Sequence, residues 1–136
     1  MRFMMLVIPK GYESAEPSRQ PDPKQVEQMM KFNEELASSG VLLSLDGLAP
    51  PSAGARVSFT GGKPKVTDGP FAEAKECVGG YWMIQAKSKE EAIEWAKRAP
   101  MSDHEIIEVR RVMEMDDFSP EVRAAAAGFE EMQGRK

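Results

Sequence analysis

The sequence contains little cysteine, little histidine and no long apolar run. Its single cysteine, Cys77, cannot form a disulfide within the chain, so nothing indicates an oxidising compartment. No run approaches the roughly 20 apolar residues of a membrane-spanning helix, and the apolar opening, residues 2–8, is too short for a signal peptide. A net charge of −4 offers no basic surface for nucleic acid. These absences predict a cytoplasmic protein that binds neither a membrane nor nucleic acid directly.

Motifs for metals and cofactors are missing as well. The only histidine, His104, lies in the polar stretch MSDHEI, and no group of histidines and cysteines has the spacing of a metal site. Ten methionines are better explained as core residues than as ligands of a soft metal. Cys77 stands at the start of an apolar run, which favours a buried structural thiol over a nucleophile. We therefore expect no metal and no cofactor.

Hydrophobic periodicity and end signals predict a regular series of elements. A chain of 136 residues forms one domain with a proper core. The expected elements are a strand at 2–8, a helix from the N-cap Asp22 to Gly40, a strand at 41–45, a hairpin of 55–60 and 63–67, a strand at 78–86, a helix at 89–99 behind the capping box of Ser88, a strand at 106–113 and a C-terminal helix. The single domain, 1–136, thus has a core of about 1–113 and a helical extension at 119–133.

Without the hairpin and the extension, the order is β-α-β-β-α-β, the ferredoxin-like α+β arrangement. In this plan both helices cover one face of an antiparallel sheet. The strands at 2–8 and 81–84 are apolar on both of their alternating faces, so the second face of the sheet also needs a cover. A second copy of the chain is the simplest cover, which predicts a homodimer with two sheets packed face to face.

The stretch TDGPF, which contains Asp68, allows a structural and a functional interpretation. In the structural one, the Asp68 carboxylate accepts hydrogen bonds from backbone N–H groups of a turn, Gly69 takes an unusual φ, Pro70 fixes the next φ, and Phe71 is anchored in the core. One or two helical turns would follow. In the functional interpretation, Asp68 orients a ligand or acts as a base if burial raises its pKa.

Polar side chains share faces of two predicted strands, namely Ser44 with Asp46, and Glu108 with Arg110. Such residues either pair with one another or border a wet cleft, because an unpaired buried charge is costly. Beside Tyr81 and Trp82, a cleft could bind a small polar or aromatic ligand. The sequence leaves both possibilities open.

These residues define a predicted ligand site. We expect a cleft bounded by Asp46, Asp68, Tyr81 and Arg110, in which Arg110 grips a carboxylate in a bidentate manner, so that a small acid or polar aromatic compound is preferred. The candidates for a catalytic role are Asp68, Asp46 and His104, although His104 is more simply a loop or capping residue.

Several blocks in order, GVLLSLDGLAPP, VTDGPFAEAKE and VGGYWMI, resemble the DGPF family of YCII-related (YciI-like) proteins over most of residues 1–113. The resemblance implies a dimeric α/β barrel of ferredoxin-like subunits and brings no established reaction. Some relatives occur beside, or fused to, extracytoplasmic-function sigma factors, which implies a role near transcription control. In smaller YCII-like relatives, a first-helix histidine and an aspartate have been proposed as an acid/base pair. Residues 22–40 contain no histidine, so that chemistry is not carried over.

Two classes of function remain open from the sequence. The first is a dimeric small-molecule-binding or regulatory domain linked to an extracytoplasmic-function sigma factor. The second is an enzyme without a cofactor that uses carboxylate acid/base chemistry on a small metabolite. The missing histidine favours the first class.

Overall fold

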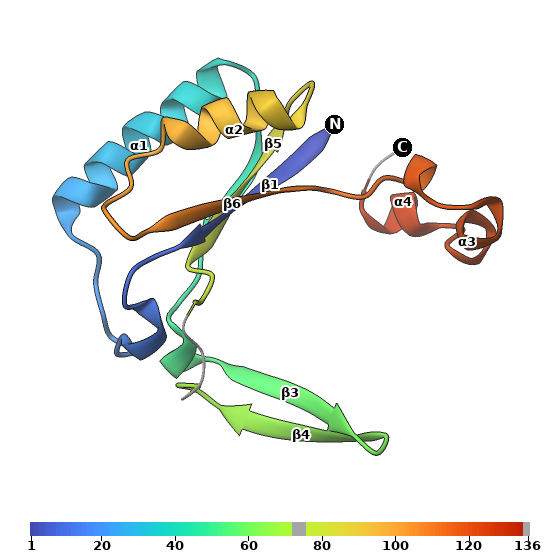
Figure 1. The fold of residues 1–136 in the computed structure, drawn as a ribbon, viewed down its shortest axis with the longest axis horizontal. Coiled ribbons are helices and arrows are strands. Elements are labelled where there is room, and N and C mark those ends of the chain that lie inside the picture. Colours follow the sequence, from blue (N-terminus) through green and yellow to red (C-terminus); the bar gives the residue numbers. More distant parts are fainter. Residues whose placement is uncertain (72–75, 135–136) are drawn as a thin grey trace.

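The computed structural model describes residues 1–71 and 76–134, which form an α+β structure (Figure 1). The elements are β1 (Arg2–Ile8), η1 (Tyr12–Ser14), α1 (Pro23–Ser38), β2 (Leu42–Gly47), η2 (Pro51–Ala53), β3 (Ala55–Thr60), β4 (Lys63–Asp68), β5 (Gly80–Gln85), α2 (Lys89–Lys97), β6 (Ile106–Arg111), η3 (Met115–Asp117), α3 (Pro120–Ala125) and α4 (Phe129–Met132). Up to β6, every predicted strand and both predicted helices within the described residues are present, with ends shifted by one or two residues.

The two main helices begin at the predicted capping residues. The Asp22 side chain accepts a hydrogen bond from the backbone N–H of Lys24 at 3.2 Å, and Pro23 occupies the first position of α1. At the start of α2, the Ser88 hydroxyl accepts from the N–H of Glu91 at 3.2 Å. Side chains in these short stretches therefore satisfy donors that the helix itself leaves unpaired, which fixes where each helix starts.

The main sheet has four strands in the order β2-β5-β1-β6, and every neighbouring pair is antiparallel. This arrangement is compatible with a ferredoxin-like fold. Helices α1 and α2 lie on the same side of the sheet (Figure 1). The pairing of β2 with β5 contains a bulge, because Leu42 opposes Ile84 while Ser44 opposes the adjacent Met83. We call the side away from α1 and α2 the helix-free face.

The core lies between the sheet and the two helices. Its buried members are Phe3, Met5, Phe32, Leu36, Trp82, Ile84, Ala86 and Ala92. The rings of Phe32 and Trp82 meet edge to face, with centroids 5.1 Å apart. Strand alternation turns the side chains of Met4, Leu6 and Met83 to the helix-free face, where they are only half-buried. Cys77 is buried, as predicted.

Strands β3 and β4 form a separate two-stranded sheet, and Figure 1 shows this hairpin projecting away from α1 and α2. Val57 opposes Val66, and Phe59 opposes Pro64. These side chains share one face, and the three large ones, Val57, Phe59 and Val66, are 53%, 74% and 65% exposed. We call these three residues the hairpin patch.

Two details of the TDGPF turn differ from expectation. Phe71 is not anchored in the core but is half-buried, with the Arg56 guanidinium 4.1 Å from its ring centroid. Gly69 is required for close approach rather than for an unusual φ, because a Cβ there would overlap the Pro51 carbonyl oxygen. The N–H of Gly69 donates to the Gly54 carbonyl at 2.9 Å, which holds the turn against η2.

The C-terminal extension, residues 112–134, forms two short helices instead of the single predicted helix. Ser119 caps α3, and Gly128, with φ 89°, separates α3 from α4, because glycine readily adopts the left-handed conformation that ends a helix. Val122, Phe129 and Met132 are 45%, 47% and 84% exposed, and we call them the tail patch. The helical turns expected after Phe71 fall on residues 72–75, outside the described residues.

Candidate functional site

The register between β2 and β5 brings two of the predicted site residues together. Asp46 lies opposite Tyr81, and the Tyr81 hydroxyl donates a hydrogen bond to Asp46 Oδ2 at 3.0 Å. Asp46 is exposed and Tyr81 is half-buried. The pair joins a hydroxyl donor and an acidic acceptor at the edge of the sheet.

A second polar pair joins β5 to α1 on the helix side of the sheet. The indole Nε1–H of Trp82 donates to Asn33 Oδ1 in α1 at 2.7 Å, and Trp82 is only 3% exposed. Sequence reasoning did not identify Asn33. The signal was available, because Asn33 is four residues after Met29 and three before Leu36, within the apolar stripe of the helix.

An open recess of about 220 Å³ lies between α1 and the ends of β2 and β5. The residues that line it include Met29, Asn33, Leu45, Asp46, Tyr81 and Trp82. Backbone completes it at Gly79 and Gly80, and a Cβ at Gly80 would lie 2.8 Å from the Asp46 carbonyl oxygen. Leu45 and Trp82 face α1 in this recess, whereas strand alternation turns the Asp46 and Tyr81 side chains to the helix-free face. The Tyr81–Asp46 pair therefore lies on the opposite side of the strands from the apolar walls. A larger hollow of about 800 Å³, lined by the loops after β1 and β2, adjoins the recess through Gly47 and Gly79.

Arg110 lies on the helix-free face but outside the recess. It belongs to β6, and β5 and β1 separate this strand from β2. The register aligns Asp46 with Glu108 across β5 and β1, so at about 4.8 Å per strand the Cα atoms of these two residues are about 14 Å apart, and Arg110 lies two residues farther along β6. The Nε of Arg110 is 3.8 Å from Glu108 Oε2, a loose contact between two exposed side chains. The structure thus places Asp46 and Arg110 on opposite edges of one sheet.

Asp68 and His104 occupy other positions at the same end of the sheet. Asp68 is the last residue of β4, opposite Ala55, and is exposed. Within residues 1–71 and 76–134, its carboxylate accepts no hydrogen bond. His104 is exposed in the turn before β6 with φ 70°, a left-handed conformation that histidine tolerates better than most residues. Neither side chain lines the recess, and their predicted functional roles stay predictions.

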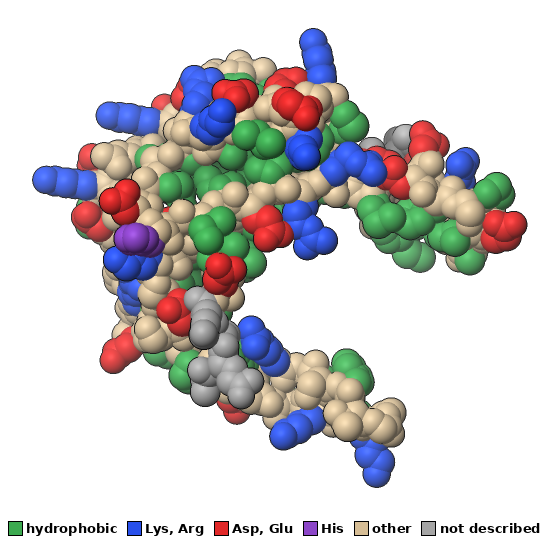
Figure 2. Space-filling view, in the orientation of Figure 1, with side chains coloured by type: hydrophobic (Ala, Val, Ile, Leu, Met, Phe, Trp, Pro, Cys, Tyr) green, Lys and Arg blue, Asp and Glu red, His purple; other side chains and the backbone are tan. Residues whose placement is uncertain are grey.

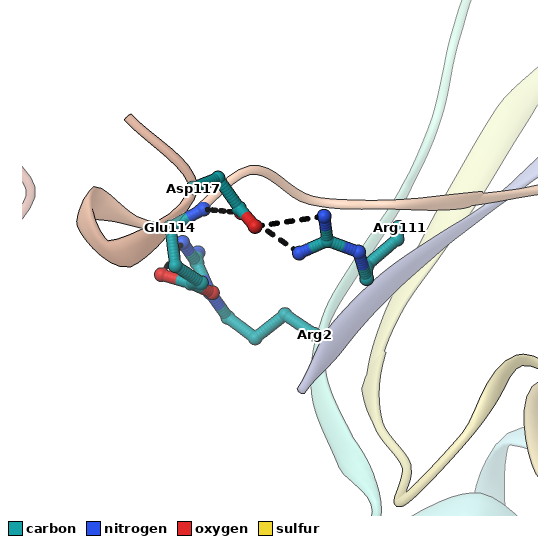
Figure 3. A network of polar contacts seen from close by, with 4 residues as sticks. All are labelled: Arg2, Arg111, Glu114 and Asp117. Atoms are coloured by element: carbon teal, nitrogen blue, oxygen red, sulfur yellow. Dashed lines mark hydrogen bonds and ion pairs between the residues drawn. The ribbon is translucent and has the colours of Figure 1, made fainter. Parts of the chain in front are cut away.

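The strongest charged network lies at the opposite end of the sheet (Figure 3). Arg2 forms two hydrogen bonds to Glu114, at 2.8 and 3.2 Å, and Arg111 forms two to Asp117, at 2.8 and 2.9 Å. The backbone N–H of Glu114 also donates to Asp117 Oδ2 at 2.7 Å. The hydrogen bonds from Arg111, and then that from Glu114, lower the pKa of Asp117 to about 2. We call these four residues the tail latch, because they tie η3 to β1 and β6.

Two kinds of feature are absent from the described part of the chain. It holds no group of three or more histidine, cysteine, aspartate and glutamate residues placed to bind a metal ion. None of its helices combines the length and the apolar character that crossing a membrane requires.

Comparison with known proteins identifies the family to which the chain belongs. The model of the YCII-related domain matches residues 1–116. An uncharacterised protein of Rhizobium meliloti (strain 1021) is 30% identical over 80 residues, which are 59% of this chain. The chain covers 64% of the length of that relative. Because the family model matches most of the sequence, the chain belongs to the YCII-related domain family.

Proposed function

We propose that the chain forms a homodimer whose subunits each bind a small molecule on the helix-free face beside Asp46 and Tyr81. The observation that carries this proposal is the Tyr81–Asp46 hydrogen bond of 3.0 Å next to the half-buried side chains of Leu6 and Met83, which lie on the same face. Small-molecule sites typically combine an apolar surface with a few fixed polar groups. Here the strand pairing fixes one such group, and Leu6 and Met83 supply the apolar surface.

The helix-free face supports the dimeric part of the proposal. Met4, Leu6 and Met83 lie side by side on the two central strands, where the register opposes Met4 to Met83. These large apolar side chains are half-buried, whereas Phe3, Met5, Trp82 and Ile84 on the helix side are buried. Packing two such faces together would remove the remaining apolar surface from water, and a two-fold axis would make the contact self-complementary. The dimeric α/β barrel implied by the resemblance has this form.

The Tyr81–Asp46 pair favours a ligand that donates a hydrogen bond. Tyr81 engages one oxygen of Asp46, and in the described part of the chain the other oxygen accepts no hydrogen bond. A carboxylate attracts amines and hydroxyls and repels anions. The neighbouring apolar side chains of Leu6 and Met83 suit an aliphatic or flat carbon skeleton. We therefore propose a small, largely apolar compound that carries an amine or hydroxyl group. The small acid expected from the sequence would instead need Arg110.

A thermal-shift series tests this proposal. Compounds that share one carbon skeleton but end in an amine, a hydroxyl or a carboxylate are compared at equal concentration. A ligand at 100 times its Kd stabilises the native state by about 2.7 kcal/mol. We expect amines or alcohols to raise the Tm of the wild type, and Asp46→Asn to reduce that rise. The matched control is Glu108→Gln, which removes a carboxylate from the same face on β6.

One result would contradict the placement of the ligand. If carboxylates raise the Tm, Arg110→Gln abolishes the rise and Asp46→Asn leaves it intact, the ligand binds on the β6 side of the sheet. The Tyr81–Asp46 pair would then be a structural feature only.

A second candidate function is catalysis, because the Tyr81 hydroxyl and the Asp46 carboxylate form a contacting donor and acceptor. Such a pair could hold and move a proton on a small metabolite without a cofactor. NMR detection of solvent deuterium incorporated into a bound carbon acid would support this function. Incorporation should fall in both Asp46→Asn and Tyr81→Phe. Binding without any incorporation would leave the domain as a receptor.

The regulatory form of the proposal has an extracytoplasmic-function sigma factor as its partner, as the family resemblance suggests. In this form, occupancy of the ligand site beside Asp46 and Tyr81 changes the affinity between the two proteins. Gel filtration of the purified proteins, with and without a ligand found in the thermal-shift series, checks this. Separate elution under both conditions would remove the sigma factor from the proposal.

A further inference from the structure

Two arms of the chain carry apolar patches that the chain itself does not cover. One arm is the β3–β4 hairpin with the hairpin patch, in which Phe59 is 74% exposed. The other is the C-terminal extension with the tail patch, in which Met132 is 84% exposed. Figure 1 shows the arms on opposite sides of an open region, and Figure 2 shows hydrophobic side chains gathered over the C-terminal helices. The arms of one chain therefore do not cover each other.

Each arm is attached to the body at its base but has no buried side chains in its helices or strands. The tail latch binds the extension to the sheet through two bidentate ion pairs, yet none of the described side chains of α3 and α4 is buried. The hairpin is fixed at its base by Gly69 against η2, yet every residue of β3 and β4 is exposed. An isolated hairpin is only marginally stable in water. Both arms thus present apolar side chains from anchored positions, as expected of surfaces that meet a partner.

The positions of the arms fit a second copy of the chain. The hairpin leaves the sheet at the end where Gly47 pairs with Gly80. The extension leaves at the other end, where Arg111 pairs with Phe3. If two sheets pack face to face about a two-fold axis that runs across the strands, opposite ends come together. The hairpin of each copy then lies beside the extension of the other.

The charges of the arms are complementary. The hairpin, residues 55–68, carries three basic residues and one acidic residue. Residues 119–133 carry three acidic residues and one basic residue. The basic residues Arg56, Lys63 and Lys65 lie on the face of the hairpin opposite the hairpin patch. They would therefore steer the approach of the two arms, while the apolar patches make the contact.

We propose that the hairpin patch of one copy docks on the tail patch of a second copy, and that the two-fold axis repeats this contact. The inference rests on the proposed homodimer and adds to it which surfaces meet. A dimer held by the helix-free faces alone, with both arms left in solvent, is the alternative that the tests must distinguish.

The first test is crosslinking between differently tagged chains that are co-expressed. One chain carries Phe59→Cys and the other Met132→Cys, and a short bis-maleimide reagent joins thiols that lie close together. Native Cys77 is buried and present in both chains. We expect a crosslinked species containing both tags. The matched control replaces Met132→Cys by Lys24→Cys, an exposed position at the start of α1. Val57→Cys with Phe129→Cys provides a second pair if either first variant fails to fold.

The outcomes separate this inference from the dimer itself. Sedimentation that shows a dimer, combined with crosslinking no greater than in the Lys24→Cys control for both cysteine pairs, would overturn the docking of the arms and keep the homodimer. Sedimentation that shows a monomer at micromolar concentration would overturn both. Crosslinking between the hairpin and the extension well above the control supports the inference.

The second test is a double-mutant cycle on the dimer dissociation constant. We expect Phe59→Ala and Met132→Ala each to raise Kd by about tenfold, which corresponds to about 1.4 kcal/mol. If the two side chains touch across the interface, the double variant should weaken the dimer by less than the two single effects combined. A Kd unchanged in both single variants, or fully additive effects, would contradict a direct contact between the patches.

Discussion

The body of the molecule and its two arms differ in how far their apolar side chains are buried. In the body, Met5, Leu36 and Ile84 are completely shielded from water between the sheet and the helices. In the arms, Phe59 and Met132 are mostly exposed although turns, caps and ion pairs fix the local backbone. Tertiary packing therefore stabilises the body, whereas local interactions stabilise the arms. One chain buries the apolar side chains of its body completely but leaves those of its arms exposed to water.

The largest expected effect separates the two regions by stability. Ile84→Ala should lower the free energy of unfolding by about 2–5 kcal/mol, because it leaves a cavity in a closely packed core. Phe59→Ala should change it by no more than about 0.5 kcal/mol in the monomer, because the side chain packs against little. Urea denaturation at low protein concentration measures both. A large loss in the Phe59 variant under those conditions would mean that the hairpin patch is covered within one chain.

A smaller effect is expected at the polar pair of Asn33 and Trp82 that lines the recess. Asn33→Leu removes the acceptor of the Trp82 indole N–H while keeping the branched shape and the number of heavy atoms of the side chain. An unsatisfied buried donor costs about 1–3 kcal/mol, and denaturation should show a loss of that size. Glu34→Leu, at the exposed neighbouring position, serves as the control. Unchanged stability of the Asn33 variant would show that water reaches Trp82, and that the recess extends deeper than the side chains suggest.

The turn that contains His104 should respond in the opposite direction. Its φ of 70° is unfavourable for any side chain with a Cβ, and glycine removes that penalty. We expect His104→Gly to leave the free energy of unfolding unchanged or to raise it by up to about 1 kcal/mol, measured by thermal denaturation. Asp103→Gly, which lies outside the left-handed region, should not stabilise the protein. Loss of ligand binding or activity in His104→Gly alone would restore histidine as a functional candidate.

The smallest effect concerns the attachment of the extension. The folded-state pKa of Asp117, about 2, lies below its ordinary value of 3.8. Its contribution to the tail latch is therefore complete above about pH 4 and is lost as the pH falls from there towards 2. The protection factors of amides in residues 112–134, that is, their exchange rates relative to the intrinsic rates at the same pH, should fall in this range while those of β1 and β5 change less. Asp117→Asn should remove this dependence, and Asp116→Asn should keep it. An equal loss of protection in body and extension would mean that they open together.

Features that depend on neighbouring residues in the sequence were predictable. Local backbone preferences are visible in the caps at Asp22 and Ser88, in the alternation of β1 and in the glycine pair between β3 and β4. The structure confirms the helices and strands that these signals predicted. The face shared by Ser44 and Asp46 follows from the same alternation. Such patterns are sufficient to order the strands and helices along the chain.

Features that depend on register or on close approach were not predictable in this way. Asp46 meets Tyr81 because of the pairing between β2 and β5, which no local pattern specifies. The same is true of Arg110, whose distance from Asp46 follows from the order of the strands. Gly69 is explained by the backbone of Pro51, which lies far from it in the sequence. The described residues therefore give only part of the predicted site, the part that one strand pair can assemble.

The bulge in β2 has a consequence for insertions and deletions. In a regular strand, residues 42, 44 and 46 would all point to one side, yet Leu42 contributes to the core while Ser44 and Asp46 point to the helix-free face. The extra residue, Leu43, shifts the alternation of β2, so that Leu42 faces the core while Asp46 faces the other side of the sheet. If one residue were deleted there, either Leu42 could be buried or Asp46 could contact Tyr81, but not both. The length of β2 at this position therefore matters as much as the identity of its side chains.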